Sequence, residues 1–443
     1  MLKTYSAFIF CLLLSFGLQA QQELGLHLMR DIGQSIKTNP ALLPSSRLVI
    51  QLPSIYANYS HTAGTIDDLV LIDGDRNVLN VDRLISLADE ENDLFVNYEL
   101  ETIGASFRWR NWGINVNHAI KSNTFLRYPK TLPQLFWQGN ADFIGQTVEF
   151  GPEQYSFAYN EFGLGLAYEH KQWTIGGRVK FLTGIGDIST PRTQATLFTS
   201  DDVYQLQLET DYEINTSSFD ATFLLDSISG LGVQYGWDDI LSFQDIFTQN
   251  AGLAFDLGIR YRPNEKWELA ASVIDIGQID WTENIRNSIS QGRFEYDGLD
   301  LGSILTVEDL SFDDAVDTLE SIFQFEERNE PGYSTQLSTK IYLSAMYQWN
   351  ENWRFAGMYY QERFQEQTKR AFALSAERNF LKMLRIGAVY AMRNERFDNI
   401  GLNVAAQLGP LRLFAMTDNV LAIVRPYDSE NVNGRVGLSL SLL

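Results

Sequence analysis

The sequence predicts an all-β fold: a transmembrane outer-membrane β-barrel of about 14 antiparallel strands, with a short N-terminal plug segment and long surface loops. Three observations predict this class. The chain starts with a segment typical of export. Its later part repeats an alternation of apolar and polar residues. Short turns alternate with long loops along the sequence.

The composition excludes several classes of protein. The 443 residues include 34 basic and 56 acidic side chains, which gives a formal charge of −22 at pH 7. Such a chain is a poor partner for nucleic acid, because phosphate binding needs a surplus of Lys and Arg. Hydrophobic residues make up 45% of the sequence, which is too many for a disordered chain. The single cysteine excludes a disulfide-stapled scaffold and a multi-cysteine zinc module.

The segment Met1–Ala20 has the features of a secretory signal peptide. Lys3 supplies a positive charge, Ala7–Leu18 is largely apolar, and Ala20 is a small residue at the expected cleavage site. The apolar run is too short for a membrane-spanning helix, which needs about 20 residues. We therefore expect a cleaved signal peptide at 1–20, a periplasmic or plug segment at 21–46 and a barrel at 47–443 in the cell outer membrane.

Alternation with period 2 recurs after this segment, and no apolar stretch is long enough to form a membrane-spanning helix. One face of each row carries aliphatic or aromatic residues, and the other carries Gly, Ser, Asn, Arg or Gln. The rows span 5 to 11 residues, and the longer ones reach the length of about 9–11 residues that a tilted strand needs to cross a bilayer. They cover Ile103–Trp109, Trp112–Val116, Phe162–Tyr168, Trp173–Phe181, Leu253–Tyr261, Trp267–Val273, Leu337–Tyr347, Trp353–Tyr359, Ile400–Leu408, Leu411–Ala415 and Val436–Leu442.

The spacing of the turns is an independent sign of an outer-membrane barrel, in which periplasmic turns are short and surface loops are long. The segment 203–225 supplies either two strands or none, so the barrel has roughly 16 strands or 14, both even numbers. The longest connection, 282–334, contains helical spacing over Val307–Ile322, which predicts a short surface or plug helix. Short turns lie near residues 110, 171, 264, 351, 380 and 409, between longer connections at 61–97, 126–153, 187–202, 226–250, 282–334 and 418–431.

Aromatic residues flank several of the short turns. Their recurrence favours a girdle at one membrane interface, although aromatic residues beside a turn also pair across neighbouring strands. The residues are Trp109 and Trp112, Tyr168 and Trp173, Tyr261 and Trp267, and Tyr347 and Trp353.

Four motifs in order along the chain carry a family resemblance. They are Asn39-Pro40-Ala41-Leu42-Leu43-Pro44, the stretch from Ala271 to Trp281 that includes Asp275, Gly277 and Asp280, the stretch from Leu411 to Val420 that includes Asp418 and Asn419, and Asn433-Gly434-Arg435-Val436-Gly437-Leu438. Together they resemble an uncharacterised Bacteroidota outer-membrane barrel family. That family is similar to the long-chain fatty-acid transporter superfamily and to the barrel subunits of the type IX secretion system.

The resemblance implies a barrel of 14 strands rather than 16. It also implies that Asn39, Pro40 and Ala41 belong to an N-terminal hatch inside the lumen. Physically, the Asn39 side chain can bond its own backbone, and Pro40 fixes an extended entry into the turn. The segment is short for a full hatch, so the loop 282–334 is a second candidate for closing the lumen.

The carboxylates in these motifs have two interpretations. Asp275 and Asp280, with Gly277 and Trp281, lie where a strand enters the longest loop, and carboxylates there are more often solvated rim residues than ligands. Asp418 and Asn419 start another surface loop, and a turn-forming Asp-Asn pair is the favoured interpretation.

Signals of catalysis or of metal binding are weak. The histidines are His27, His61, His118 and His170, and their spacing matches no zinc signature. No Gly-x-Ser-x-Gly motif occurs, and the stretch Asp73–Asn77 lacks the Gly and Glu that an EF-hand loop requires further on. The glycines at Gly163, Gly165, Gly176 and Gly177 lie on strands and indicate bends or close packing. We expect no enzymatic activity, no cofactor and no metal.

Two functions remain open at this point. The first is passive transport of a hydrophobic small molecule that occupies the lumen. The second is a structural or secretion-associated barrel that docks a secretion-system or surface protein, supported by the long acidic loops. In both functions we expect the barrel to contact outer-membrane lipid, and in neither do we expect it to bind nucleic acid.

Overall fold

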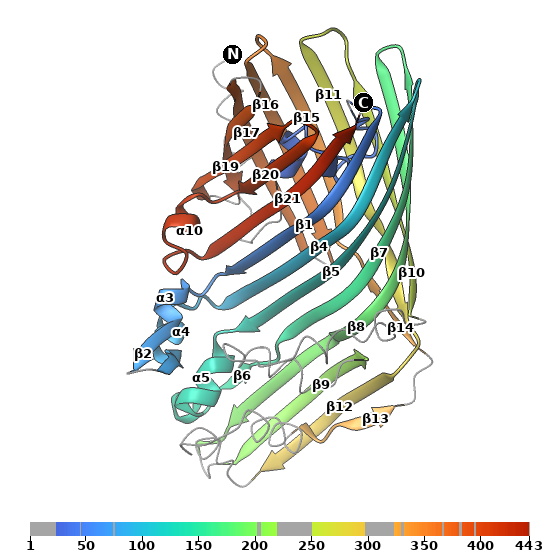
Figure 1. The fold of residues 1–443 in the computed structure, drawn as a ribbon. Coiled ribbons are helices and arrows are strands. Elements are labelled where there is room, and N and C mark those ends of the chain that lie inside the picture. Colours follow the sequence, from blue (N-terminus) through green and yellow to red (C-terminus); the bar gives the residue numbers. More distant parts are fainter. Residues whose placement is uncertain are drawn as a thin grey trace, which may run out of the picture.

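The computed structural model contains a closed antiparallel barrel of 14 strands, as predicted (Figure 1). The structure describes residues 24–44, 46–73, 76–201, 205–218, 250–296, 323–328, 332–365, 367–380, 383–393 and 396–442. The barrel closes where the first strand pairs with the last, from Leu48 opposite Leu442 to Ser60 opposite Asn431. Closure leaves no unpaired edge in the wall.

The barrel strands follow one another around the wall in chain order. They are β1 (Leu48–His61), β4 (Glu91–Trp109), β5 (Trp112–Pro129), β7 (Glu153–His170), β8 (Trp173–Thr199), β10 (Ala251–Tyr261), β11 (Trp267–Trp281), β15 (Thr339–Gln348), β16 (Trp353–Phe364), β17 (Gln367–Phe380), β18 (Leu384–Arg393), β19 (Arg396–Leu408), β20 (Leu411–Thr417) and β21 (Asn431–Leu442). A short strand, β14 (Tyr333–Gln336), precedes β15 and pairs with the far end of β11. Every predicted short turn joins two of these strands.

In the segment 203–225, predicted to supply two spanning strands or none, the described residues 205–218 form one strand, which lies outside the barrel. This strand, β9 (Leu206–Ser217), pairs with the outer half of β8 and with β12 (Ile285–Tyr296). The wall has an even number of strands, as predicted, because β9 stays outside it and pairs instead with β12, which lies inside the connection predicted as a loop. The strands β6 (Thr147–Glu149) and β13 (Glu326–Arg328) extend the same sheet.

We call β6, the outer half of β8, β9, β12 and β13 the outer sheet. It projects beyond the barrel at the end opposite the short turns (Figure 1). Its apolar side packs with helix α5 (Thr131–Gln138). Its core consists of Leu135, Phe150, Ala195, Leu197, Leu206, Leu208, Tyr212 and Phe323. The predicted loop at 187–202 is thus a continuation of a strand, which ends at Thr199.

The remaining elements are short. They are α2 (Gly25–Leu28), η1 (Gly33–Lys37), α3 (Ile66–Leu69), β2 (Val70–Asp73), β3 (Arg76–Leu79), α4 (Val81–Leu87), η2 (Ala141–Phe143) and α10 (Leu421–Val424). Among the residues that the structure describes, no helix is long and apolar enough to cross a bilayer. The predicted signal peptide at 1–20 and the predicted helix at Val307–Ile322 lie outside the described residues.

The outer face of the barrel is apolar because one row of each alternating strand points outward. Exposed aliphatic and aromatic side chains occur all around it, among them Ile103, Ile114, Leu164, Ile175, Phe181, Leu257, Leu343, Leu374, Ile400 and Val436. Of the aromatic residues beside the short turns, Trp109, Trp112, Tyr168, Trp173 and Trp267 are exposed on this face, whereas Tyr261, Tyr347 and Trp353 are half-buried. Several of them also pair across strands. Ring centroids are 4.5 Å apart for Trp112 and Tyr168, 4.2 Å for Trp173 and Tyr261, and 4.8 Å for Trp267 and Tyr347.

Candidate functional site

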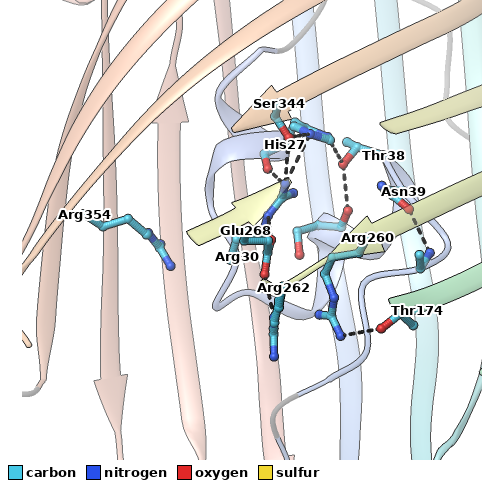
Figure 2. Close-up of polar contacts among 12 residues, drawn as sticks. His27, Arg30, Thr38, Asn39, Thr174, Arg260, Arg262, Glu268, Ser344 and Arg354 are labelled. Atoms are coloured by element: carbon cyan, nitrogen blue, oxygen red, sulfur yellow. Dashed lines mark hydrogen bonds and ion pairs between the residues drawn. The ribbon is translucent and has the colours of Figure 1, made fainter. Parts of the chain in front are cut away.

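An N-terminal segment lies inside the barrel at the short-turn end. We call residues 24–44 the inner segment. Its backbone and side chains contact strands on every side of the wall, which is possible only for a segment within the closed barrel (Figures 1 and 2). The wall residues that it contacts include Gln51, Glu99, Arg178, Glu268, Ala271, Ser344, Arg354 and Leu438.

The first turn of the inner segment is held by Asp418. The backbone N–H of Leu24 donates to Asp418 Oδ2 at 2.8 Å, and that of Gly25 donates to Asp418 Oδ1 at 3.1 Å. These N–H groups lie at the start of α2, where no carbonyl of a preceding helical turn is available to accept their hydrogen bonds. The prediction that Asp418 forms a local turn is wrong, because its buried carboxylate faces the lumen. Asn419 does act locally, since its Oδ1 accepts the backbone N–H of Ala422 at 3.4 Å.

The predicted plug motif forms a tight turn against the wall. Asn39 Oδ1 accepts the backbone N–H of Ala41 at 2.8 Å, and Asn39 Nδ2 donates to Ala271 O at 3.2 Å. Wall glycines make room for this turn. A Cβ at Gly176 would lie 2.3 Å from Pro40 O, and one at Gly258 would lie 2.1 Å from Asn39 Oδ1. Gly176, one of the glycines predicted to mark bends or close packing, thus admits the backbone of the inner segment.

His27 and Arg30 connect the inner segment to β11 and β15 (Figure 2). His27 Nδ1 lies 2.9 Å from Thr38 Oγ1, and its Nε2 lies 2.9 Å from Ser344 Oγ. Burial, and then the charge of Arg30, lowers the pKa of His27 well below its usual value, so the ring is neutral. Arg30 Nε donates to Glu268 Oε1 at 3.0 Å.

A network of buried charges lies deeper in the lumen, centred on Lys180. Its Nζ is 2.9 Å from Asp256 Oδ1 and also contacts Asp275. Asp275 Oδ2 forms a second ion pair with Lys340 Nζ at 2.9 Å. Arg178 Nη1 forms an ion pair with Asp256 Oδ2 at 3.1 Å. Buried charges of this kind are tolerated only when each is paired.

The prediction that Asp275 is a solvated rim residue is wrong, because its side chain is 3% exposed. A β-bulge gives the reason. Phe255 lies opposite Ile276 and Leu257 lies opposite Val273, so Asp256 faces two residues of β11. Asp275 has a φ of 61°, and the extra residue turns its side chain from the outer face to the lumen.

The same bulge reorients the rest of the motif. Trp281 is completely buried, and a Cβ on Gly184 would lie 2.2 Å from its ring. Gly277 allows close backbone approach, since a Cβ there would lie 2.1 Å from Leu253 O. Asp280 is exposed, and its Oδ1 accepts a hydrogen bond from Ser334 Oγ at 2.6 Å.

A small cavity lies between the inner segment and the loop end of the barrel. Its volume is about 70 Å³, enough for a few water molecules. One side carries Lys37, Glu99, Lys121, Glu161, Lys180, Asp275, Lys340 and Arg435, and the other carries Tyr56, Phe157, Tyr159 and Tyr342. Leu26, Lys37 and Thr38 of the inner segment belong to the lining of this cavity.

Aromatic rings line the lumen on the loop side of this cavity. We call Phe95, Phe125, Tyr155, Phe157, Tyr159 and Phe364 the aromatic group. The ring of Phe364 lies 6.0 Å from that of Phe157, 6.4 Å from that of Phe125 and 5.5 Å from that of Tyr155. Phe157 and Tyr159 belong to both the aromatic group and the cavity.

Of the charged residues around Lys180, only Asp275 was singled out in the sequence, although a signal for the others exists. Arg178 and Lys180 alternate with apolar residues on one strand, and Asp256 and Arg260 do so on the next. Reading the second row of each strand would therefore have shown charges at positions that a 14-stranded barrel turns inward.

Several solved structures are similar to this chain. A TodX monoaromatic hydrocarbon channel mutant aligns with a TM-score of 0.46 at 10% identity, covering 93% of this chain and 95% of that chain. A FadL homologue of Pseudomonas aeruginosa aligns with a TM-score of 0.44 at 9% identity, covering 96% and 99%. The toluene transporter TodX of P. putida aligns with a TM-score of 0.43 at 9% identity, covering 93% and 94%.

No curated protein matches the chain in sequence. A family model does match, over residues 40–418. The match begins within the Asn39-Pro40-Ala41 motif and ends at Asp418, so it spans the wall of the barrel between the two anchors of the inner segment. The chain belongs to the family of unknown function DUF5723.

Proposed function

We propose that the protein is an outer-membrane barrel that carries a small hydrophobic molecule through a lumen closed at rest by the inner segment. The apolar outer face and its ring of aromatic residues suit a bilayer, and a closed barrel satisfies every backbone group of the wall within it. The short turns then face the periplasm and the outer sheet faces the outside.

The aromatic group carries the argument for a hydrophobic solute. A water-filled pore for polar solutes would have an open lumen, whereas here rings fill the loop side and continue into the cavity. A row of aromatic faces offers an apolar molecule a favourable surface at each step. The cavity of about 70 Å³ is smaller than a typical ligand site of about 300–1,000 Å³, so passage requires that the inner segment or these rings move.

The first experiment is uptake of 1-N-phenylnaphthylamine, a fluorescent apolar probe, by cells that express the protein. We expect faster uptake than in cells without it. Phe364→Glu should abolish the gain, because it places a carboxylate among the rings, where an unpaired charge is costly. Arg363→Glu is the matched control, since this neighbouring side chain is exposed. Equal uptake by cells with and without the protein would contradict the proposal.

Docking of a partner protein is the second candidate function, and the outer sheet is the observation that favours it. The sheet projects beyond the barrel and has its own apolar core, so it is a rigid surface rather than a set of loops. Native mass spectrometry of protein extracted from its own membrane separates the two functions. A bound apolar small molecule favours transport, and a stoichiometric second protein favours docking. A secretion-associated role would belong to this second function.

A further inference from the structure

The inner segment and the short turns enclose a second pocket, which is distinct from the cavity beside the aromatic group. Its volume is about 840 Å³. It is formed by the inner segment on one side and the ends of the strands and their turns on the other. Its basic side chains, which we call the basic mouth, are Arg30, Arg108, Arg260, Arg262, Lys266, Arg354 and Arg412.

The charge of the basic mouth is opposite to that of the chain as a whole. Seven basic side chains line the pocket against three acidic ones, Asp31, Glu265 and Glu268, whereas the whole chain carries −22. A local excess of positive charge is unexpected in an acidic protein, because randomly placed charges would include more carboxylates than basic groups. The excess therefore indicates a specific role for this pocket.

Two carboxylates near the pocket are each shared by two arginines, whereas Arg354 pairs with both Asp31 and Glu377. Glu268 pairs with Arg30 at 3.0 Å and with Arg262 at 3.0 Å. Glu169 pairs with Arg108 at 3.0 Å and lies 3.6 Å from Arg260. Each of these two carboxylates pairs with two arginines, so each group of three side chains carries a net charge of +1.

Arg260 is the most deeply buried side chain of the basic mouth. Its side chain is only 3% exposed, and it donates from Nη2 to the neutral Thr174 Oγ1 at 3.0 Å (Figure 2). Its buried Nε has no hydrogen-bond partner among the residues that the structure describes. Arg412 likewise donates to a neutral acceptor, Gln407 Oε1, at 2.6 Å. Buried guanidinium groups are costly unless their donors are satisfied.

We infer that the basic mouth is a binding site for a small periplasmic solute that carries carboxylate or phosphate groups. Arginine is suited to these groups, since its planar fork binds two oxygens of one oxyanion at once. Six of the seven basic side chains are arginine. A solute bound there would contact both the inner segment, through Arg30, and the wall, through Arg260, and so would stabilise their association. The inference rests on the proposed orientation of the barrel, with its short turns in the periplasm, and not on which molecule crosses the lumen.

The test uses the full-length protein in detergent, with inorganic phosphate and succinate as probes. Thermal unfolding and titration calorimetry are measured with each probe, and with sodium chloride at the same ionic strength to account for screening. We expect a saturable rise in the unfolding temperature with a probe and none with chloride. Arg260→Gln and Arg412→Gln should each weaken binding by about tenfold or more, because each removes charge-assisted hydrogen bonds.

The matched control is Arg425→Gln, an exposed arginine directly after α10 at the loop end of the barrel. Arg262→Gln is a second test variant, since Arg262 is half-exposed and its loss should not affect folding. Absence of saturable binding of both probes would overturn the inference, as would equal losses in Arg260→Gln and Arg425→Gln.

A phospholipid headgroup could supply the same phosphate chemistry. Native mass spectrometry distinguishes the sources. Phospholipid that copurifies and is displaced by phosphate identifies a headgroup, and binding of phosphate to lipid-free protein identifies a free solute. Either result supports an oxyanion site. Arg260→Gln protein that retains the same lipid and the same phosphate affinity would exclude it.

Discussion

The close approach of Gly176 to the inner segment yields the sharpest prediction, for the variant Gly176→Ala. A Cβ at this position would lie 2.3 Å from Pro40 O, 2.4 Å from Pro40 C and 2.7 Å from Ala41 N. All three are backbone atoms, so no side-chain rotation can relieve the contact. The turn that contains Asn39 must therefore move away from β8.

The size of the movement follows from these distances. Ordinary contacts begin near 3.4 Å, so Pro40 O at 2.3 Å must retreat by about 1 Å. The same shift would break the bonds from Asn39 Nδ2 to Ala271 O at 3.2 Å and from Ser272 Oγ to Thr38 O at 2.6 Å. Two neutral hydrogen bonds contribute about 1–3 kcal/mol, so the fraction of protein with a displaced inner segment should rise by about 5–150-fold.

The assay is ion conductance of the purified protein in a planar bilayer, where displacement of the inner segment opens the lumen. Gly177→Ala is the matched control, because a Cβ there would have its nearest contact at 3.8 Å. Both variants are first checked for folding by their gel mobility before and after heating. If the folded Gly176→Ala and Gly177→Ala proteins have equal conductance, Gly176 is not what allows the inner segment to pack against the wall.

Three further predictions concern the anchors and charges of the lumen. Asp418→Ala removes the acceptor for two backbone N–H groups, so docking of the inner segment should weaken by about 1–3 kcal/mol and its sensitivity to added protease should rise. Lys180→Met leaves Asp256 and Asp275 without a shared cation, and the free energy of unfolding should fall by about 3–5 kcal/mol in a urea titration. His27 has a lowered pKa when docked, so the displaced state binds more protons below about pH 6.5, and conductance should increase as the pH falls through that range but not in His27→Gln.

Each of these predictions has a control in the chain. Asp428→Ala changes an exposed carboxylate and should leave protease sensitivity unchanged. Lys171→Met changes an exposed turn residue and should not alter the urea midpoint. Asp275→Asn added to Lys180→Met should recover part of the lost stability, and no recovery would mean that the two groups do not act as a pair. A pH response that persists in His27→Gln would assign it to other groups.

Much of the wall could be predicted from the sequence because strand periodicity is a local property. Rows such as Trp173–Phe181 and Leu253–Tyr261 alternate strictly, and a wall between lipid and lumen imposes that alternation on every strand. The short turns were found for the same reason. The strand β12 was missed because its register depends on β9, which lies far away in the sequence.

The candidate site was only partly predictable. The turn at Asn39 was expected, since an Asn-Pro pair favours a turn through its own side chain. The contact of this turn with Gly176 and Gly258 was not expected, because the residues around a glycine in a strand do not show which other segment packs against it. Asp418 was assigned to a turn for the same reason: its partners are the N–H groups of Leu24 and Gly25 at the other end of the chain.

The sequence by itself determined the alternating strands of the barrel and the end at which its turns are short, because alternation and turn spacing act within a few residues. It left 14 or 16 strands open, and the closed wall of the structure has 14. Only the tertiary structure decided which side of the wall Asp275 faces. One extra residue in β11 reverses the alternation there, and whether a bulge forms depends on the carboxylate of Asp256 in β10, which accepts the Asp275 N–H at 2.8 Å. Closure of the barrel then places that side chain against Lys180 and Lys340.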